Sequence, residues 1–194
     1  MRKVVATEYI TLDGVIEDPG GGEATPYGGW SRAFFDEQAG KFKFDELFAS
    51  DTLLLGRITY EGFAKAWPNI QDEHGFADRM NSLPKFVVSS TLKSPEWKNS
   101  SVIQGNLAQE VAKLKQQSGQ DILLAGSSQL VRGLLRLGLI DELRLMLHPV
   151  VVGGGKRLFT DEGARKSLRL KDTQAFKGGI VMLYYEPIHE QATS

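Results

Sequence analysis

An arginine and a threonine follow directly on a short apolar run in residues 53–61. The run 53–55 predicts a buried strand that stops at Gly56, and Arg57 and Thr59 come where a helix begins. Free backbone N–H groups and the positive end of the helix dipole favour an anion at such a junction, and the arginine fork can grip phosphate oxygens. The alternative interpretation is that Arg57 pairs with a surface carboxylate while Thr59 caps the helix.

A second junction of the same kind follows the apolar run 122–125. It presents Gly126, Ser127 and Ser128, so that two hydroxyls and free amides come together at the predicted start of a helix. Such groups suit phosphate oxygens, although N-capping alone would account for one of the serines.

Hydroxyl groups also mark the end of a third predicted strand, at Ser89, Ser90 and Thr91. They suit phosphate or ribose oxygens, and ordinary turn chemistry is the alternative. The three strand ends together would line one edge of the sheet, where open α/β folds bind their ligands. Because a dinucleotide must be held at both ends, paired junctions in one small domain predict a dinucleotide site.

Carboxylates near the predicted lip of this site are the candidates for acid–base chemistry. Asp13 lies in an Asp-Gly turn, where such residues often bond their own backbone. Asp36 and Glu37 lie near the start of a predicted helix, and a carboxyl partly buried beside Trp30 and the neighbouring phenylalanines would have a raised pKa. A solvated helix face is the alternative for this pair.

Other chemistries find no pattern in the sequence. The histidines at 74, 148 and 189 have no metal-ligand spacing, and His148 lies in an apolar strand, so core packing is its better interpretation. We therefore expect no metal site. There is no cysteine, no P-loop, no Gly-x-Ser-x-Gly elbow and no Gly-x-Gly-x-x-Gly fingerprint. A dinucleotide would have to bind outside the Rossmann pattern.

Composition sets the broad class of the protein. The 194 residues carry a net charge of −1, with 41% hydrophobic and 24% charged residues, which is typical of one soluble globular domain. The charge gives no support to nucleic-acid binding, and no apolar run approaches the roughly 20 residues of a membrane span. Glu8 and Asp13 interrupt any signal-peptide core, so a cytoplasmic location is the default expectation.

The elements that position these residues alternate first and then change character. A glycine-rich loop at 18–30 precedes a helix expected from Ser31 to about 48. A short helix over about 60–66 leads into a polar loop that reaches Pro84. Two further helices follow Asn106 and Ser127, the last ending at Gly138. Strands are expected at 4–12, 52–56, 85–90, 101–104, 121–125, 143–152, 168–176 and 180–186.

This order predicts an α/β fold: a mixed, mostly parallel central sheet flanked by helices, with antiparallel strands at the C-terminal end. We expect a single domain over residues 1–187 and a loose tail at 188–194.

The motifs together resemble the dihydrofolate reductase superfamily, and more closely its branch that contains the C-terminal reductase domain of bifunctional riboflavin-biosynthesis deaminase–reductases. The resemblance covers nearly the whole chain. It rests on TLDG at 11–14, LGRITYE at 55–61, VSS at 88–90, LAG at 124–126, LIDEL at 139–143 and PVVVGGG at 149–155.

The resemblance implies hydride transfer from NADPH to a flat nitrogen heterocycle. It places the loop 17–30, with Trp30, as a mobile lid and Asp13 beside the substrate. It assigns the cofactor to three groups: Gly56, Arg57 and Thr59 on phosphates, Ser89 and Ser90 near the adenosine 2′-phosphate, and Gly126, Ser127 and Ser128 around the pyrophosphate.

Departures from the family pattern bear on the substrate. Asp36, the candidate catalytic acid, comes one position later than dihydrofolate reductases place theirs, and Leu124 stands where the riboflavin reductases often have an acid. The family's Gly-Gly pair with a cis bond is Ala125-Gly126 here, so a cis bond is predicted at that pair. The nearest activity is 5-amino-6-(5-phosphoribosylamino)uracil reduction; dihydrofolate or pterin reduction and a non-catalytic dinucleotide-binding module are the alternatives. The strand 143–152 with its triple glycine would form a homodimer contact or, alternatively, an ordinary core strand.

Overall fold

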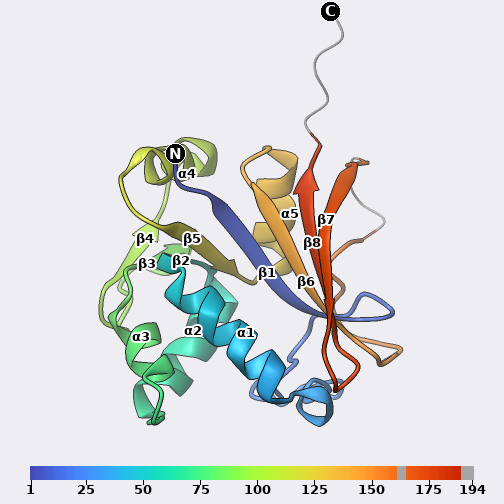
Figure 1. Ribbon diagram of the computed structural model, residues 1–194. Coiled ribbons are helices and arrows are strands. Elements are labelled where there is room, and N and C mark those ends of the chain that lie inside the picture. The colour runs from blue at the N-terminus through green and yellow to red at the C-terminus, as the bar shows by residue number, and fades with distance from the viewer. Residues whose placement is uncertain (161–164, 189–194) are drawn as a thin grey trace, which may run out of the picture.

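The computed structural model describes residues 1–160 and 165–188. The chain forms one eight-stranded sheet in the order β4-β3-β2-β5-β1-β6-β8-β7 (Figure 1). Neighbouring strands from β4 to β6 are parallel, whereas β8 runs antiparallel to β6, and β7 antiparallel to β8. The strands are β1 (Val4–Thr11), β2 (Ser50–Gly56), β3 (Lys85–Val88), β4 (Ser100–Ile103), β5 (Asp121–Ala125), β6 (Glu142–His148), β7 (Leu168–Ala175) and β8 (Val181–Pro187). The predicted fold class is confirmed.

Five α-helices cover the two faces of this sheet in the described chain. They are α1 (Glu37–Phe48), α2 (Arg57–Ala66), α3 (Phe76–Ser82), α4 (Leu107–Gln116) and α5 (Ser128–Arg136). Successive residues of a strand point to opposite faces, so Leu53 and Leu55 pack with α1, α2 and α3 while Leu54 packs with α4 and α5. The central strands are therefore buried on both faces, which is why they read as continuous apolar runs.

The helix expected from Ser31 begins later than predicted. A short 3₁₀ turn occupies Arg32–Phe34, and α1 starts at Glu37 with Asp36 as its N-cap. Phe35, expected on the buried face of that helix, lies outside it and is 44% exposed. The predicted start is wrong because Asp36, which the sequence pattern places within the helix, is in fact the N-cap that begins it.

Three further elements differ from the prediction. The polar loop predicted up to Pro84 contains α3, whose first turn is held by the Asp72 carboxylate, which accepts the amides of Phe76 and Ala77. Strand β6 stops at His148 instead of 152, because Pro149 has no N–H to donate to a ladder. Helix α2 begins at Arg57, earlier than expected.

Lys85 opens β3 as a buried cation. It is 1% exposed, and its ammonium donates to the carbonyls of Asn81, Leu83 and Lys98. The ammonium lies 4.2 Å from the ring centre of Trp97, within cation–π range. Burial lowers the pKa of Lys85 to about 8.

Of the predicted tail at 188–194, only Ile188 falls within the described residues, and its amide donates to the carbonyl of Ser167. No helix among the described residues is long and apolar enough to cross a bilayer.

Candidate dinucleotide-binding site

The two strand-to-helix junctions meet in the structure. The Gly56 amide donates to the Gly126 carbonyl at 3.3 Å. A Cβ atom at Gly126 would lie 2.7 Å from the Thr59 hydroxyl oxygen, and one at Gly56 would overlap the Ser127 side chain. Gly126 also has a φ of +65°, which glycine adopts without strain. The carboxyl ends of β2 and β5 therefore form a close-packed pair of turns in which neither glycine can be replaced without displacing a neighbour.

Helices α2 and α5 both begin at this contact without a side-chain cap, as far as the described residues show. Gly56, the N-cap of α2, has no side chain, and Ser127, the N-cap of α5, makes no capping hydrogen bond. The capping alternative for Ser127 is thus not realised. The first N–H groups of a helix have no partner within it and carry partial positive charge. Two such helix N-termini therefore lie side by side at the Gly56–Gly126 contact. Such an arrangement suits an extended ligand with more than one phosphate.

Arg57 takes the alternative role that its sequence allowed. Its Nη1 atom donates to both carboxylate oxygens of Glu61, at 2.8 and 2.9 Å, one helical turn away. The two side chains are 42% and 49% exposed. Exposed pairs of this kind stabilise a protein by only about 0.3–0.5 kcal/mol, so the guanidinium can exchange its partner for a phosphate at little cost.

The serines after β3 lie beside the same edge, because Val88 pairs with Gly56 in the sheet. The Ser89 hydroxyl accepts the amides of Thr91 and Leu92, so it forms the turn that the alternative interpretation described. Ser90 is exposed, and Ser128 is the half-buried first residue of α5.

Glu8 lies beside this contact, although the sequence pattern did not single it out as a candidate site residue. Thr7 pairs with Ala125, so Glu8, which lies within β1, comes next in register to Gly126, just beyond the carboxyl end of β5. It is 7% exposed, and its Oε1 atom has no hydrogen-bond partner among the described residues. Burial raises the pKa of the Glu8 carboxyl to about 8, against the positive charge of Lys43 and hydrogen bonding from the Gly126 amide. The signal was a lone acid inside the apolar run of β1.

Asp36 does not have the environment expected of a proton donor. One carboxylate oxygen accepts the Ala39 amide at 2.8 Å and caps α1, and the other accepts the Gly178 amide at 2.8 Å. These hydrogen bonds, the first of them foremost, lower the pKa of Asp36. The expectation of a raised pKa is wrong, because backbone donors stabilise the carboxylate more than its aromatic neighbours disfavour it.

Asp13 fastens the turn after β1 to the triple-glycine segment. Its carboxylate accepts the Thr11 hydroxyl and the amides of Val152 and Gly153. The Thr11 bond is the largest of the effects that lower the pKa of Asp13 to about 2. The structure thus gives Asp13 a structural role in holding these two segments together.

The loop that contains Trp30 packs against the end of β6 through its indole ring. The Trp30 indole donates to the Glu17 carbonyl at 2.9 Å, and its ring meets His148 edge-on at 5.0 Å. Asp18 accepts the amides of Glu23 and Thr25 within the loop. His148 is fully buried, as core packing predicted, although its Nε2 atom has no partner in the described structure.

The bond expected to be cis is displaced by one residue. The cis peptide joins Gly126 to Ser127, whereas the sequence placed it between Ala125 and Gly126. It therefore lies inside the turn that contacts Gly56.

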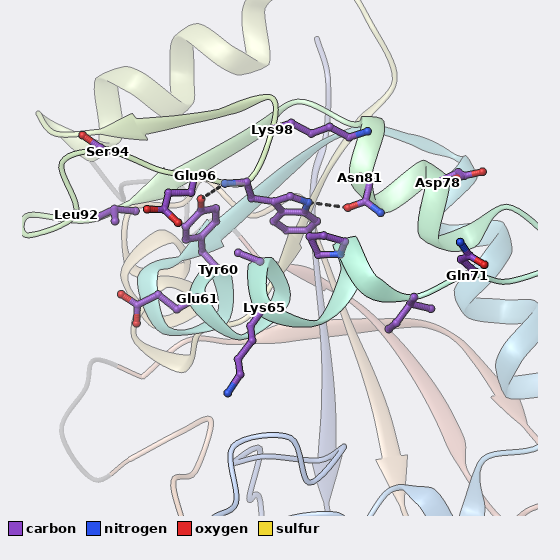
Figure 2. Close-up of a pocket in the computed structure, with 14 residues that line it drawn as sticks. Tyr60, Glu61, Lys65, Gln71, Asp78, Asn81, Leu92, Ser94, Glu96 and Lys98 are labelled. Atoms are coloured by element: carbon purple, nitrogen blue, oxygen red, sulfur yellow. Dashed lines mark hydrogen bonds between the residues drawn. The ribbon is translucent and has the colours of Figure 1, made fainter.

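A groove of about 840 Å³ lies elsewhere, over α2 and α3 (Figure 2). Tyr60 and Trp97 are buried residues of its lining: the Tyr60 hydroxyl accepts the Trp97 amide, and the Trp97 indole donates to Asn81. None of the predicted cofactor residues is among the described residues that line it. Among the described residues, no group of three acidic or histidine side chains is placed to hold a metal ion.

The comparisons with known proteins agree with this architecture. The model of the RibD C-terminal domain family matches residues 2–182. The chain is 35% identical over 188 residues to the uncharacterized protein YyaP of Bacillus subtilis, covering 95% of this chain and 94% of that protein.

Solved structures share the fold at lower identity. A putative riboflavin biosynthesis protein from Shewanella sp. PV-4 has a TM-score of 0.76 at 20% identity, covering 96% of this chain and 99% of that one. Dihydrofolate reductase from Enterococcus faecalis, complexed with NADP(H), gives 0.59 at 15% identity, with 95% and 96% covered. The Thermotoga maritima diaminohydroxyphosphoribosylaminopyrimidine deaminase/5-amino-6-(5-phosphoribosylamino)uracil reductase gives 0.62 at 15% identity; 96% of this chain matches 57% of that chain.

Because the family model matches residues 2–182, nearly the whole chain, the protein belongs to the family of RibD C-terminal, reductase-like domains.

Proposed function

We propose that this protein is an NADPH-dependent reductase of a nitrogen heterocycle. The observation that carries the proposal is the meeting of two uncapped helix N-termini at the Gly56–Gly126 contact. The NADP(H) complex of the Enterococcus faecalis dihydrofolate reductase, which shares the fold, supports the choice of cofactor.

In this proposal the first turns of α2 and α5 bind the phosphates of the dinucleotide. Arg57 leaves Glu61 to pair with a phosphate, and the hydroxyls of Thr59, Ser127 and Ser128 add hydrogen bonds. Ser90, exposed beyond β3, and the turn at Ser89 lie on the side where the adenosine 2′-phosphate would bind, which favours NADPH over NADH.

Bound NADPH supplies the hydride, and the protein supplies orientation and electrostatics. The substrate that we favour is 5-amino-6-(5-phosphoribosylamino)uracil, because the Thermotoga maritima deaminase/reductase of that activity has the same fold. A dihydrofolate-like pterin is the second candidate, on the likeness to dihydrofolate reductase. Asp36 is left out of the proposed proton transfer because backbone amides hold its carboxylate ionised.

The test joins binding to turnover. We expect NADPH to raise the melting temperature more than NADH does, and absorbance at 340 nm to fall when the aminouracil is added. A thermal shift without turnover on any aminouracil or pterin would replace the enzyme with a non-catalytic dinucleotide-binding module. The absence of any shift with either nucleotide would refute the dinucleotide site itself.

We also propose a homodimer and a cytoplasmic location. Strand β6, predicted to form the dimer contact, lies between β1 and β8, so the contact must use another surface. Light scattering on the eluting protein measures the mass directly; a mass of 21.4 kDa would refute the dimer.

A further inference from the structure

Glu8 is a buried acid that neither the core nor the proposed phosphate contacts use. It lies within β1, next in register to Gly126, and Gly126 belongs to the turn where α5 begins. Its Oε1 atom is buried without a hydrogen-bond partner in the described structure. Leaving a buried carboxylate oxygen unpaired costs free energy, so its position beside the anion-binding turn calls for a physical explanation.

The groups around Glu8 decide its charge. Across the sheet, β6 places Leu145 opposite it, which gives no charge compensation. The β5–α5 turn offers the Gly126 amide, and the first ionisable residue of α5, Arg132, is bonded to the carbonyls of Arg157 and Leu158.

On α1, Lys43 is the charged group whose field reaches Glu8. Its ammonium is already paired with Glu46 and bonded to the Thr7 hydroxyl. Burial therefore prevails over this attraction.

We propose that the protonated carboxyl of Glu8 keeps the Gly126–Ser127 turn receptive to an anionic dinucleotide, and that loss of this proton weakens dinucleotide binding. An ionised Glu8 would set a negative charge in a low-dielectric site next to a bound phosphate. It would also strengthen the hydrogen bond that it accepts from the Gly126 amide, which leaves that amide less available to the ligand. Glu8 is thus a positioning residue for the proposed cofactor. The inference rests on the proposed function.

The size of the effect follows from the fraction of protein that carries the proton. With a pKa of about 8, nearly all molecules are protonated at pH 7 and about one in ten at pH 9. If only the protonated form binds, the apparent Kd for the dinucleotide rises about tenfold between pH 7 and pH 9.

The experiment measures Kd for NADPH by calorimetry from pH 6.5 to 9.5, with wild type and Glu8→Gln. NADH serves as the matched ligand, because a phosphate monoester titrates near pH 6 and NADH has no 2′-phosphate. We expect the loss of affinity at high pH with both nucleotides in wild type, and a flat profile for Glu8→Gln, whose neutral amide stands in for the protonated acid.

Lys43→Met provides a variant in which Glu8 remains intact. Because the positive charge of Lys43 lowers the pKa of Glu8, its removal should move the decline in affinity to higher pH. A ¹³C NMR titration of the Glu8 carboxyl in wild type gives a readout that needs no substitution; adding NADPH should shift that titration to higher pH.

Nucleotide binding with a flat profile in wild type, or the same decline in Glu8→Gln, overturns this inference alone. In the second case the titrating group lies elsewhere, and Lys85, with its pKa of about 8, is the first to examine. Failure of both nucleotides to bind at any pH overturns the inference together with the proposed function.

Discussion

Helices α1 and α4 begin differently from α2 and α5. Asp36 accepts the Ala39 amide at the start of α1, and Asn106 accepts the Gln109 amide at the start of α4. Within the described chain, Gly56 and Ser127 give α2 and α5 no such bond. A cap stabilises a helix by consuming one of its free amides. The fold thus uses these amides for stability in one pair of helices, and in the other pair we propose that they bind a ligand.

The largest effect is expected from a substitution at the Gly56–Gly126 contact, where the two uncapped helices begin. Gly126→Ala puts a methyl group 2.7 Å from the Thr59 hydroxyl at a positive φ. We expect it to weaken NADPH binding about 100-fold, since displacing the Thr59 hydroxyl and the turn would remove hydrogen bonds to a phosphate that contribute about 1.5–3 kcal/mol each. The left-handed backbone adds about 1–2 kcal/mol of lost stability.

Gly133→Ala is the matched control for this variant. It lies within α5 with open space around its Cβ position, so we expect a gain in unfolding free energy of about 0.5–1 kcal/mol and unchanged binding. Equal affinity of the two variants for NADPH, measured by calorimetry, would show that the glycine contact is not part of the binding site.

Arg57→Ala tests whether the arginine of the exposed ion pair on α2 binds a phosphate of the dinucleotide. A charge-assisted hydrogen bond contributes about 1.5–3 kcal/mol, so the Kd for NADPH should rise about tenfold or more. Glu61→Gln, which frees the guanidinium, should leave affinity equal or higher. A matching loss of affinity in Glu61→Gln would indicate that the pair acts as a unit and does not exchange.

Removing the side chain of one N-cap residue of each kind tests the difference between the helices further. Asp36→Ala should lower the melting temperature by about 2–4 °C, as loss of a cap does in a domain of this size, without changing the Kd for NADPH. Ser127→Ala should leave the melting temperature unchanged and weaken binding. Calorimetric scans with and without NADPH measure both, and a binding defect in Asp36→Ala would restore a functional role to that acid.

The smallest effect is expected for Asp13, in the dependence of stability on acid pH. Its folded pKa of about 2 lies below the ordinary aspartate value of 3.8, so its contribution to stability is present above pH 3.8 and is lost as the pH falls towards 2. Denaturant unfolding between pH 5 and pH 2 should show a shallower dependence in Asp13→Asn than in wild type. Parallel profiles would mean that the stabilisation provided by the hydrogen bonds from the Val152 and Gly153 amides does not depend on the negative charge of Asp13.

The pairing of the junctions was predictable because it follows from strand order. Apolar runs that end in glycine and hydroxyl residues mark the carboxyl ends of parallel strands, and those ends share one edge of the sheet. The sequence could not show that β2 and β5 are direct neighbours, or that Thr59 lies against Gly126. Those facts depend on register, which only the folded sheet displays.

The acids could not be sorted from the sequence for a similar reason. Asp36 receives a donor from Gly178, 142 residues away, and that contact decides its charge. The pKa of Glu8 shifts in the opposite direction, upwards, and here too the environment comes from segments that lie far along the chain, the β5–α5 turn and helix α1. A pattern gives the type of a side chain, whereas its partners come from distant segments.

The buried ammonium of Lys85 makes one primary amine of this protein a sensor of local opening. At 1% exposure it is shielded from acylating reagents while Trp97 and the three carbonyls hold it. Its acylation must wait for the segment between α3 and β3 to open, whereas exposed lysines react at once. Mass spectrometry of timed acylation therefore reports how often this side of the sheet opens.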